Sequence, residues 1–577
     1  MSMLRTAAIR SARASARPAL KLYRPSTVTS PAPRLYSSQP GSHHPTGSTN
    51  WFVGSLIVFG PLLFYLTSPP ESKKQHSHAE HAPSLVHKIE DAVAAVKAPA
   101  KPYVLVGSGT ASFAAAQAIK EQEPNANVII IGSESVPPYM RPPLSKELWF
   151  SDDANASETL RFKDWQGNER SAVYQDISEY EIITDLADIN KESSKIKLLL
   201  QKTVTKLDVE AHTVKLNDGQ IIEYNKVLLA TGGSPKQLPN QSGVKNVTTF
   251  RTVDDLRKLD AIAKNNAHIV IVGGGFLGSE LAIALAHRAK KEGLKVTQVF
   301  PEEGNMANVF PTYLTKWTTS RVKDEGVEIK SKHSIKSIDG AEGDKVKLTF
   351  ENNESLEADH VVVAVGIEPR VEVARAAGLE IDDQRAGVVV NAELESRRDV
   401  FAAGDMISFH DIQLGRRRIE HHDHAVLSGR HAGENMVGKN KPYKHQSMFW
   451  SDLGPKIGYE AVGLVDSQLS TVSVWAKASD ADTPAAAVSQ PENLRGVDVQ
   501  DIKSSEEQAA PSNKQPGNAS EGTVFNDEKF GKGLVFYMKN KKVVGVLLFN
   551  VFGKVQEARD VISNQTSVDH IEQIVSK

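Results

Sequence analysis

The chain has 577 residues, 40% of them hydrophobic and 24% charged, with a formal net charge of −2. This length and composition are typical of two to four globular domains. The chain has no cysteine, which excludes structural disulfides, thiolate metal sites, cysteine nucleophiles and redox dithiols.

The charge is unevenly distributed along the chain. Residues 1–70 hold seven of the 68 basic side chains and no acidic one, so the other residues carry 61 basic and 70 acidic groups. An acidic body disfavours nucleic acid as the main partner, because binding to phosphates is driven by a basic surface.

The first hundred residues contain three segments of different composition. Residues 1–37 are rich in Arg, Ser and Ala and lack acids, which is typical of a mitochondrial targeting peptide; the alternative is a disordered basic arm. Residues 51–67 are uncharged and apolar, at the short end of the roughly 17–25 residues of a transmembrane helix. Residues 68–100 are polar and are expected to form a linker. Together they predict a single-pass protein of the mitochondrial inner membrane whose body faces the intermembrane space.

A glycine-rich turn follows the first apolar run of the body. Tyr103–Val106 is expected to be a buried strand, and Gly107-x-Gly109-x-x-Ser112 then leads into an alanine-rich helix. Such a turn needs one glycine for its tight bend and another where the backbone approaches a pyrophosphate, while the third small residue lets helix pack on strand. The next predicted strand, 127–131, ends just before Glu134, whose carboxylate is suited to a ribose.

The same pattern recurs in the middle of the chain. A predicted strand from His268 leads into Gly273-x-Gly275-x-x-Gly278 and a helix, and Lys295–Phe300 is expected to be the next strand. Glu302 then stands where a ribose is bound, without the arginine cluster that favours a 2′-phosphate. The repeat predicts two Rossmann-like domains and favours NADH over NADPH at the second.

Two further predicted strands, at 226–233 and 360–369, end in glycine, where the chain is expected to cross between domains. Another predicted strand, at 399–405, has Gly404-Asp405 at its end. This order resembles the flavoproteins of the glutathione-reductase type, which have two dinucleotide-binding domains. The resemblance implies that the first glycine motif holds FAD, that the second holds NAD(P)H, and that Gly404-Asp405 binds the flavin ribityl chain. Without cysteine, the electron acceptor is not an internal disulfide.

Longer motifs make the resemblance more specific. PYMRPPLSKELWFSDD, GGGFLGSELA, FPEEGNM, GRRRIEHHDHAVLSGR and KPYKHQSMFWSDLGP together resemble the mitochondrial apoptosis-inducing factors, in a fungal-type version. The resemblance covers about residues 102–475 and resumes at 531–550. It implies an α/β fold with an FAD-binding domain at 100–235 and 368–446, an NAD-binding domain at 236–367, and a C-terminal α+β domain at 447–577.

The C-terminal domain is expected to contain strands near 458–465, 468–475, 533–537 and 542–550. Between them, residues 476–522 are rich in Ala, Ser, Pro, Asn and acids, so they cannot bury enough apolar surface to fold. We expect this insertion to be disordered. It is either a tolerated surface loop or a redox-responsive or partner-binding lid.

A pair of opposite charges is expected beside the flavin. Lys146 lies in a proline-rich loop, and Glu280 lies just inside the helix after the second glycine motif. A lysine near the flavin, held by this carboxylate, would set the redox potential and orient the nicotinamide. Lys146, Glu280 and His421 are the predicted catalytic residues.

The resemblance also implies binding residues for both cofactors. For FAD these are Gly107, Ser108, Gly109, Thr110, Ala111, Ser133, Glu134, Arg141, Lys146, Val204, Arg251, Asp405, His421, His422 and Trp450. For NADH these are Gly274, Gly275, Phe276, Leu277, Glu280, Glu302, Gly366, Glu420, Trp450 and Glu460. Two places depart from the family pattern. Ser133 and Glu134 compete for the ribose because the acid comes one position late, and Asn308 replaces a lysine expected to help hold the NADH phosphates.

Residues 420–424, EHHDH, are the densest group of metal-ligand side chains in the chain. Histidines at i, i+1 and i+3 do not share a helix face, and no cysteine completes a shell, so we expect no metal site. A helix is expected to begin here, and its dipole would stabilise a reduced, anionic flavin. We assign Glu420 and His421 to the flavin–nicotinamide cleft and His422 to the flavin edge. Asp423 and His424 are expected to be local packing partners.

The resemblance implies an FAD-dependent NADH oxidoreductase that forms a long-lived charge-transfer complex, dimerises on reduction and binds a protein partner in intermembrane-space import. It also implies support of respiratory-chain biogenesis and, after release, a role in cell death; DNA is a partner to consider only after release. Three alternatives remain open: a reductase of a ferredoxin-like iron–sulfur protein, an NADH:quinone reductase, and a scaffold that has lost its chemistry.

Overall fold

The computed structural model describes residues 101–191, 193–239, 241, 243–476, 482–484, 531–567 and 570. The predicted targeting peptide (1–37), anchor (51–67) and linker (68–100) lie outside these residues, as does most of the predicted insertion at 476–522. No helix within the described ranges combines the length and the apolar character that crossing a membrane requires.

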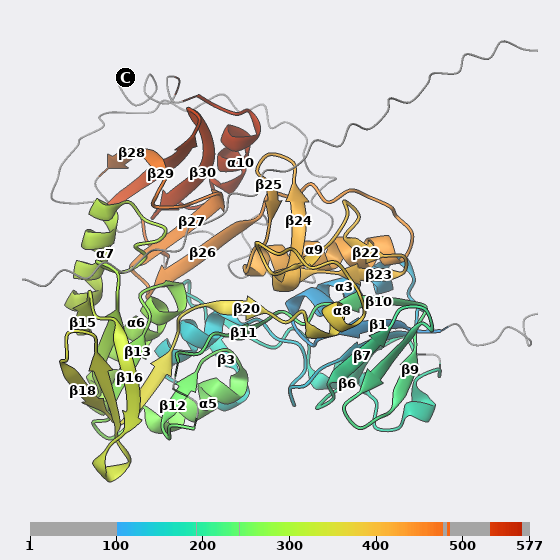
Figure 1. Ribbon diagram of the computed structural model, residues 1–577, viewed down its shortest axis with the longest axis horizontal. Coiled ribbons are helices and arrows are strands. Elements are labelled where there is room, and N and C mark those ends of the chain that lie inside the picture. The colour runs from blue at the N-terminus through green and yellow to red at the C-terminus, as the bar shows by residue number, and fades with distance from the viewer. Residues whose placement is uncertain are drawn as a thin grey trace, which may run out of the picture. The chain divides into compact units, whose positions relative to one another are not determined.

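The first glycine motif belongs to a seven-stranded sheet of order β22-β23-β10-β1-β2-β6-β5 (Figure 1). Its central strands pair in parallel, and β1 and β2 are buried throughout because parallel sheets are covered on both faces. Strands β22 and β23 come from much later in the chain, so two separate segments complete one sheet. The strands are β1 (Tyr103–Val106), β2 (Val128–Ile131), β5 (Tyr180–Ile182), β6 (Ile196–Leu199), β10 (Lys226–Leu229), β22 (Glu395–Arg397) and β23 (Val400–Ala402).

Helices α3 (Thr110–Gln122) and α9 (His422–Met436) pack against each other with their backbones in near contact. A Cβ added at Gly429 would lie 2.2 Å from the backbone oxygen of Ala111, and one added at Gly433 would lie 2.4 Å from that of Ala115. Glycine is therefore required at both crossings. The order of these contacts shows that the helices run in the same direction, so both N-termini face the same edge of the sheet.

The second glycine motif belongs to a five-stranded sheet of order β12-β19-β13-β14-β15, in which every neighbouring pair is parallel. The predicted strand at Lys295–Phe300 coincides with β14. The strands are β12 (Val247–Thr249), β13 (His268–Val272), β14 (Lys295–Phe300), β15 (Glu328–Ser331) and β19 (His360–Val363), and the helices of this part of the chain are α5 (Val253–Ile262), α6 (Phe276–Glu292) and α7 (Thr312–Asp324).

Two short strands connect the two parallel sheets. Strand β11 (Gly233–Pro235) pairs antiparallel with β20 (Ile367–Pro369), and the two run side by side between the sheets in Figure 1. They coincide with the two places where the sequence predicts that the chain crosses between domains.

Small sheets flank the two parallel ones. They are formed by β7 (Val204–Asp208), β8 (Thr213–Leu216) and β9 (Ile221–Glu223), by β16 (Ile335–Gly340), β17 (Val346–Phe350) and β18 (Ser355–Ala358), by β24 (Ile407–Asp411) with β21 (Val388–Val389) and β25 (Gly415–Arg417), and by the hairpin β3 (Arg161–Lys163) and β4 (Glu169–Ser171). The proline-rich loop before that hairpin forms two 3₁₀ turns, Pro142–Ser145 and Glu147–Phe150, followed by α4 (Ala156–Thr159). Helix α8 (Glu372–Ala376) follows β20.

The last described part of the chain is an antiparallel sheet of order β26-β27-β30-β29-β28 with α10 (Val555–Ser563) against β27 and β30. Its strands are β26 (Met448–Leu453), β27 (Ile457–Gly463), β28 (Ser470–Ala476), β29 (Lys532–Lys539) and β30 (Lys542–Phe549). Ala476, the first residue of the predicted insertion, is the last residue of β28. Strand β26 also contacts α6, which brings this sheet to the second glycine motif.

Replacing Gly433 with Ala is expected to destabilise the fold, because the added methyl group meets backbone atoms that have no rotamer to move aside. Overpacking costs roughly 1–3 kcal/mol and the gain in helix propensity is about 1 kcal/mol, so we expect a net loss of about 1 kcal/mol, and at most about 2 kcal/mol, in the free energy of unfolding. Denaturant titration measures this change. Gly340→Ala is the control, since a Cβ at Gly340 meets nothing within 4 Å, and equal losses for both variants would contradict the argument.

Candidate functional site

A cavity of about 590 Å³ lies where the central strands of the first sheet end. Its lining includes residues that directly follow four of these strands: Gly107 after β1, Ser133 near the end of β2, Ala230 after β10 and Ala403 after β23. Ligands of open parallel sheets bind at the carboxyl ends of the strands, because the turns there face an open crevice. The cavity thus occupies the expected place for a nucleotide.

The first glycine motif forms one wall of the cavity. Gly107 has a φ of +111°, and a Cβ there would lie 2.3 Å from the backbone oxygen of Ala230, so the turn accepts only glycine. Gly109 is the N-cap residue of α3, and no side chain caps the helix at this end. A Cβ at Gly109 would meet nothing within 4 Å, so its backbone borders open space. Uncapped N–H groups and the helix dipole favour an anion such as a pyrophosphate.

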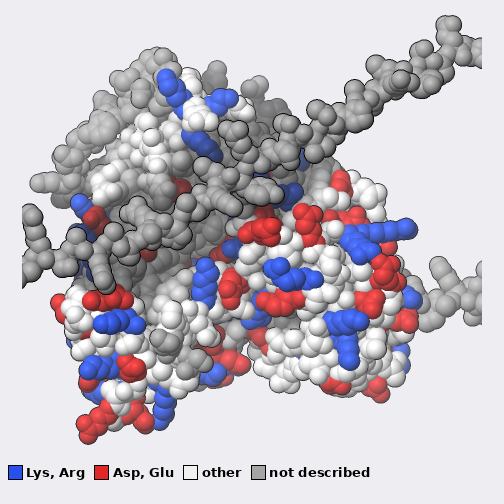
Figure 2. Space-filling view, viewed as in Figure 1, with Lys and Arg blue, Asp and Glu red and all other residues white. Residues whose placement is uncertain are grey.

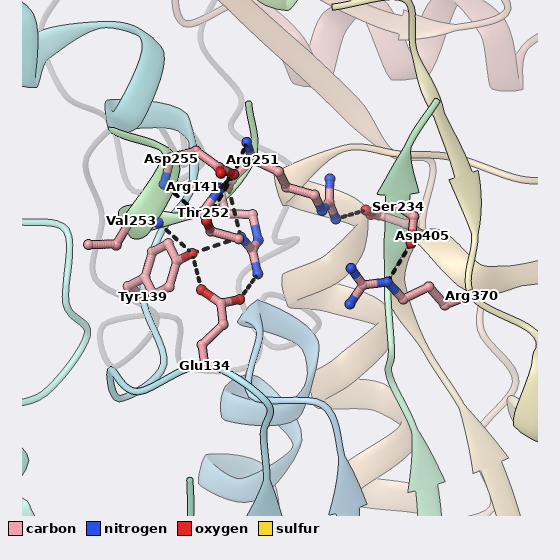
Figure 3. A network of polar contacts seen from close by, with 10 residues as sticks. All are labelled: Glu134, Tyr139, Arg141, Ser234, Arg251, Thr252, Val253, Asp255, Arg370 and Asp405. Atoms are coloured by element: carbon pink, nitrogen blue, oxygen red, sulfur yellow. Dashed lines mark hydrogen bonds and ion pairs between the residues drawn. The ribbon is translucent and has the colours of Figure 1, made fainter. Parts of the chain in front are cut away.

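A network of polar contacts surrounds the predicted ribose position (Figure 3). Glu134 accepts a hydrogen bond from Tyr139 at 2.6 Å and forms an ion pair with Arg141 at 2.8 Å. Burial alone would raise the pKa of Glu134, but Arg141 and Tyr139 outweigh it and hold that pKa below its ordinary value. Arg251 pairs with Asp405 at 3.0 Å. Glu134 therefore stays ionised and positioned at the cavity wall.

Arg370 is a cavity residue that the sequence reasoning missed. It directly follows β20, lines the cavity, and donates through Nε to the hydroxyl of Ser234 at 2.6 Å (Figure 3). Burial lowers the pKa of Arg370, and the charges of Arg251 and Arg141 add to this effect. Three guanidinium groups thus converge on one cavity, which attracts the negative charge of phosphates. No glycine motif or residue spacing in the sequence indicates a role for Arg370, which directly follows the end of β20.

The predicted pair of Lys146 and Glu280 is formed and buried. The ammonium of Lys146 lies 3.1 Å from Oε1 of Glu280, and the side chains are 5% and 7% exposed. Ser145 and Ser451 also donate to Glu280, each at 2.5 Å. Burial alone would lower the pKa of Lys146, but the carboxylates of Glu280, Glu147 and Asp452 outweigh it and raise that pKa. A fixed positive charge therefore borders the cavity.

The start of α9 supplies two histidines to the cavity. His421 stacks on Phe449 with ring centroids 4.5 Å apart, and His422 meets the ring of Trp450 edge-on at 5.6 Å. Burial lowers the pKa of both histidines to about 4. Both rings are therefore neutral at physiological pH. They offer aromatic surface and a hydrogen-bonding nitrogen rather than charge.

The side chains of residues 420–424 do not converge on one point. Glu420 pairs with Arg418 at 2.6 Å, while Asp423 pairs with His445 at 2.9 Å and accepts from the backbone N–H of Met448. His424 is buried against the ring of Phe409. Within the described ranges, no group of three or more His, Cys, Asp or Glu side chains is arranged to hold a metal ion.

The second glycine motif is held by a buried polar network. The amide of Gln298 donates to the backbone oxygen of Gly273 at 2.8 Å, and Asn305 donates to Gln298 and to Ser279. Gly273 has a φ of +128°, and a Cβ there would lie 2.2 Å from the backbone oxygen of Ala364. Gly275 caps α6 without a side-chain partner and borders open space. The turn has the same form as the first one.

The predicted site residues are brought together to different degrees. Every residue assigned to FAD lines the cavity. Of those assigned to NADH, the cavity is lined by Phe276, Leu277, Glu280, Glu420 and Trp450, and not by Gly274, Gly275, Glu302, Gly366 and Glu460. Glu460 is fully buried on β27. The individual roles of all these residues remain predictions.

The cavity has the features that a flavin dinucleotide requires. A dinucleotide needs a glycine cradle for its pyrophosphate, which Gly107 and Gly109 supply, and an ionised acid for a ribose, which Glu134 supplies. The rings of Phe449 and Trp450, together with Lys146, line the same cavity. The volume lies within the roughly 300–1,000 Å³ of small-molecule sites. The residues present therefore fit FAD.

Replacing Glu280 with Gln is expected to destabilise the protein, because it leaves the buried charge of Lys146 without its counter-charge. Breaking a buried ion pair costs about 3–5 kcal/mol. The double variant Lys146→Met with Glu280→Met should recover most of this loss, because it removes both charges. Chemical denaturation with saturating FAD measures both.

A surface pair serves as the control for that measurement. Lys245 and Asp344 are 69% and 71% exposed, and Asp344→Asn should change the free energy of unfolding by less than about 1 kcal/mol. Equal losses in the single and double variants at Lys146 and Glu280 would show that packing, rather than an unpaired charge, dominates.

Acid is expected to destabilise the protein through its buried histidines. The ordinary histidine pKa is about 6.5, and burial lowers the pKa of His424 to about 3. Protons therefore bind the unfolded chain first, so the stability contribution is complete above pH 6.5 and is lost as pH falls towards 3. Between pH 7 and 5, His424 should account for about 2 kcal/mol of lost stability. His424→Gln should flatten the pH profile of denaturant unfolding, whereas His410→Gln, at an exposed residue, should not.

Two family models match the chain in succession. The pyridine nucleotide-disulphide oxidoreductase model matches residues 101–429. The model for the C-terminal region of mitochondrion-associated apoptosis-inducing factor matches residues 432–564. The second match begins inside α9 and covers the antiparallel sheet with α10.

Individual relatives agree with these models. The protein named "putative apoptosis-inducing factor 1, mitochondrial" of Drosophila melanogaster is 43% identical over 484 residues, which are 82% of this chain and 64% of that protein. The apoptosis-inducing factor 1 of Dictyostelium discoideum is 37% identical over 479 residues, 82% of this chain and 80% of that one.

A solved ferredoxin reductase from Rhodopseudomonas palustris has the same fold, with a TM-score of 0.61 and 24% identity over 81% of this chain and 96% of that one. The family matches agree with the two glycine turns and with the buried Lys146–Glu280 pair, which are the features expected of a two-dinucleotide flavoprotein. The chain belongs to the pyridine nucleotide-disulphide oxidoreductase family, in its apoptosis-inducing-factor branch.

Proposed function

We propose that the chain is an FAD-dependent NADH oxidoreductase of the apoptosis-inducing-factor type. FAD and NAD(H) are the cofactors of its family. The observation that carries the proposal is a single cavity in which the glycine cradle of Gly107 and Gly109, the ionised Glu134 and the buried Lys146–Glu280 pair all meet. These groups match the pyrophosphate, the ribose and the reactive ring of a flavin dinucleotide in that order.

Each group has a distinct task in this proposal. The start of α3 and the guanidinium groups of Arg251 and Arg370 would bind the phosphates. FAD, when bound, accepts a pair of electrons from NADH. Lys146, held by Glu280, keeps a positive charge beside the place where negative charge accumulates. Phe276 and Phe449, whose ring centroids lie 5.1 Å apart, exclude water from that end.

The preference for NADH over NADPH rests on the acid after β14. Glu302 follows Phe300 and Pro301, where a ribose of the second dinucleotide would lie. A carboxylate there accepts hydrogen bonds from a ribose diol and repels a 2′-phosphate. Gly274, Gly275, Leu277, Gly366 and Glu460 complete the NADH site that we propose from the family resemblance, with Asn308 in place of a lysine near the phosphates.

The domain division follows the pairing of the strands. We assign 100–235 and 368–446 to the FAD domain, which is supported by β22 and β23 joining the sheet of β1. Residues 236–367 form the NAD domain and 447–577 the C-terminal domain. The insertion at 476–522 is assigned to partner binding or redox response. We further propose that the presequence 1–37 and the anchor 51–67 direct the chain to the mitochondrial inner membrane. The relatives named as mitochondrial support the organelle.

Reduction by NADH is proposed to gate association. A long-lived charge-transfer complex would favour a homodimer and binding of a protein partner in intermembrane-space import, in support of respiratory-chain biogenesis and, after release, of cell death. DNA is the weaker partner. On the face shown in Figure 2, acidic and basic side chains are interspersed over the described surface, whereas phosphate binding requires a basic patch.

Two enzymatic alternatives differ in the electron acceptor. The likeness to a solved ferredoxin reductase concerns the fold and leaves a small iron–sulfur protein as an alternative acceptor. A quinone is the other alternative. A scaffold without redox chemistry is disfavoured, because the buried Lys146–Glu280 pair holds a positive charge at the cofactor cavity, where an inert protein needs none.

Purified full-length chain should be yellow and should show a stable long-wavelength absorbance band on anaerobic addition of NADH, together with a doubled mass in solution. NADPH at the same concentration should reduce the chain at least about tenfold less efficiently, since the acid at Glu302 opposes its extra phosphate. Rapid turnover with ferredoxin or quinone and no dimer would favour the alternatives. A colourless chain that does not take up added FAD would contradict the whole proposal.

A further inference from the structure

A second cavity of about 610 Å³ adjoins the first. Pro142 and Trp450 line both cavities, so these two side chains form part of the wall between them. The second cavity extends from this wall to the hairpin of β3 and β4, where Arg161, Glu169 and Arg170 line it. Its lining therefore combines the charged side chains of the hairpin with the two prolines, Pro142 and Pro143.

Glu147 lines the second cavity and is 8% exposed. Among the described residues, its Oε2 atom has no hydrogen-bond partner. This is unusual for a buried carboxylate, since an ionised oxygen without a partner costs several kcal/mol. The contrast with Glu280 is sharp, because Glu280 receives two hydroxyl donors and one ammonium. Glu147 thus lacks the hydroxyl and ammonium donors that hold Glu280, and the positive charge that acts on it comes from Lys146.

The residue before Glu147 faces the other cavity. Lys146 lines the first cavity and Glu147 lines the second, because the chain breaks between two 3₁₀ turns at Lys146, whose φ and ψ are −130° and −107°. The charge of Lys146, at the first cavity, therefore acts on the carboxylate of Glu147, the next residue in the chain. That carboxylate itself lies at the second cavity.

The charged surroundings of Glu147 come from several elements. Those acting on it most directly are Lys146 in the same loop, Asp452 on β26 and Glu280 on α6. Across the second cavity stand Arg161, Asp164, Glu169, Arg170 and Asp176. Burial raises the pKa of Glu147 to about 7; Lys146 opposes this, and Asp452 and Glu280 add to it. Small changes in nearby charge therefore change its protonation at neutral pH.

We infer that Glu147 is the proton reservoir of the cofactor cavity, taking up a proton from water through the second cavity when negative charge accumulates in the first, and returning it when that charge leaves. This inference rests on the proposed function. The chemical step is protonation of a carboxylate by water-borne H⁺ and its reversal, and no bond to the cofactor forms or breaks. A unit charge about 10 Å away in a medium of effective dielectric constant about 20 raises a carboxyl pKa by roughly one unit.

The test is the pH dependence of the midpoint potential of bound FAD, measured by spectroelectrochemical titration of the full-length holoprotein between pH 5.5 and 9. The wild type should take up one additional proton per electron pair near pH 7. The plot of midpoint potential against pH should therefore have a steeper slope there. Glu147→Gln keeps the shape and removes the proton, so the additional slope should vanish. Glu169→Gln, whose carboxylate lines the same cavity but is 73% exposed, should keep the wild-type profile.

Two further measurements separate this inference from a structural role. Infrared difference spectra on reduction should show a carboxylic-acid C=O band that is absent in Glu147→Gln. Stability should also respond. The pKa of Glu147 is raised in the folded state, so its contribution is complete below the ordinary pKa near 4.5 and is lost as pH rises to about 7. Glu147→Gln should therefore gain stability relative to the wild type between pH 5 and pH 8.

The outcomes distinguish the two proposals. If FAD does not bind or NADH does not reduce it, the proposed function fails. If reduction proceeds normally but the slope is the same in wild type and Glu147→Gln, only the proton reservoir is overturned. If that variant does not fold, a pH indicator is used to measure proton uptake by the wild type during reduction. Reduction without additional proton uptake near pH 7 overturns the inference.

Discussion

One buried carboxylate connects three distant segments of the described chain. Glu280, on the helix that follows the second glycine turn, receives Lys146 and Ser145 from the proline-rich loop of the first part and Ser451 from β26 of the last. An ionised group with 7% exposure is stable only when these donors are all in place. The electrostatic requirement of this one side chain therefore fixes the loop, α6 and β26 around the cofactor cavity, and the cavity walls depend on that arrangement.

Steric and pattern rules predicted the parts of the fold that depend on neighbours in sequence. Gly107 and Gly273 follow buried apolar strands, and both adopt positive φ values in turns too tight for a side chain, so the two glycine motifs were recognisable from the sequence. Lys146 and Glu280 were also predicted to pair, from the place of the lysine in a proline-rich loop and of the carboxylate just inside the helix after the second glycine motif. Arg370, Ser451 and Glu147 were not assigned roles. Their importance arises from contacts between distant segments, which local periodicity does not encode.

The histidine cluster shows how burial decides chemistry that composition leaves open. EHHDH has the residue types of a metal site, yet the start of α9 turns His421 and His422 onto aromatic rings and Asp423 onto His445. Burial keeps both cavity histidines neutral, with pKa values of about 4. The positive charge beside the cofactor position thus comes from Lys146 and the N-terminus of α9, neither of which changes with pH in the physiological range.

A fixed charge and a titratable one stand next to each other in the chain for a geometric reason. The backbone break at Lys146 turns two consecutive side chains to opposite sides of the loop, one into each cavity. Lys146 is held ionised by Glu280, whereas Glu147 has no such partner among the described residues and sits near the midpoint of its titration at neutral pH. A permanent positive charge favours reduction of the cofactor, but its magnitude does not change when the electrons arrive. An adjacent carboxyl group that gains or loses a proton supplies such a change, and it lines a second cavity that shares Pro142 and Trp450 with the cofactor cavity.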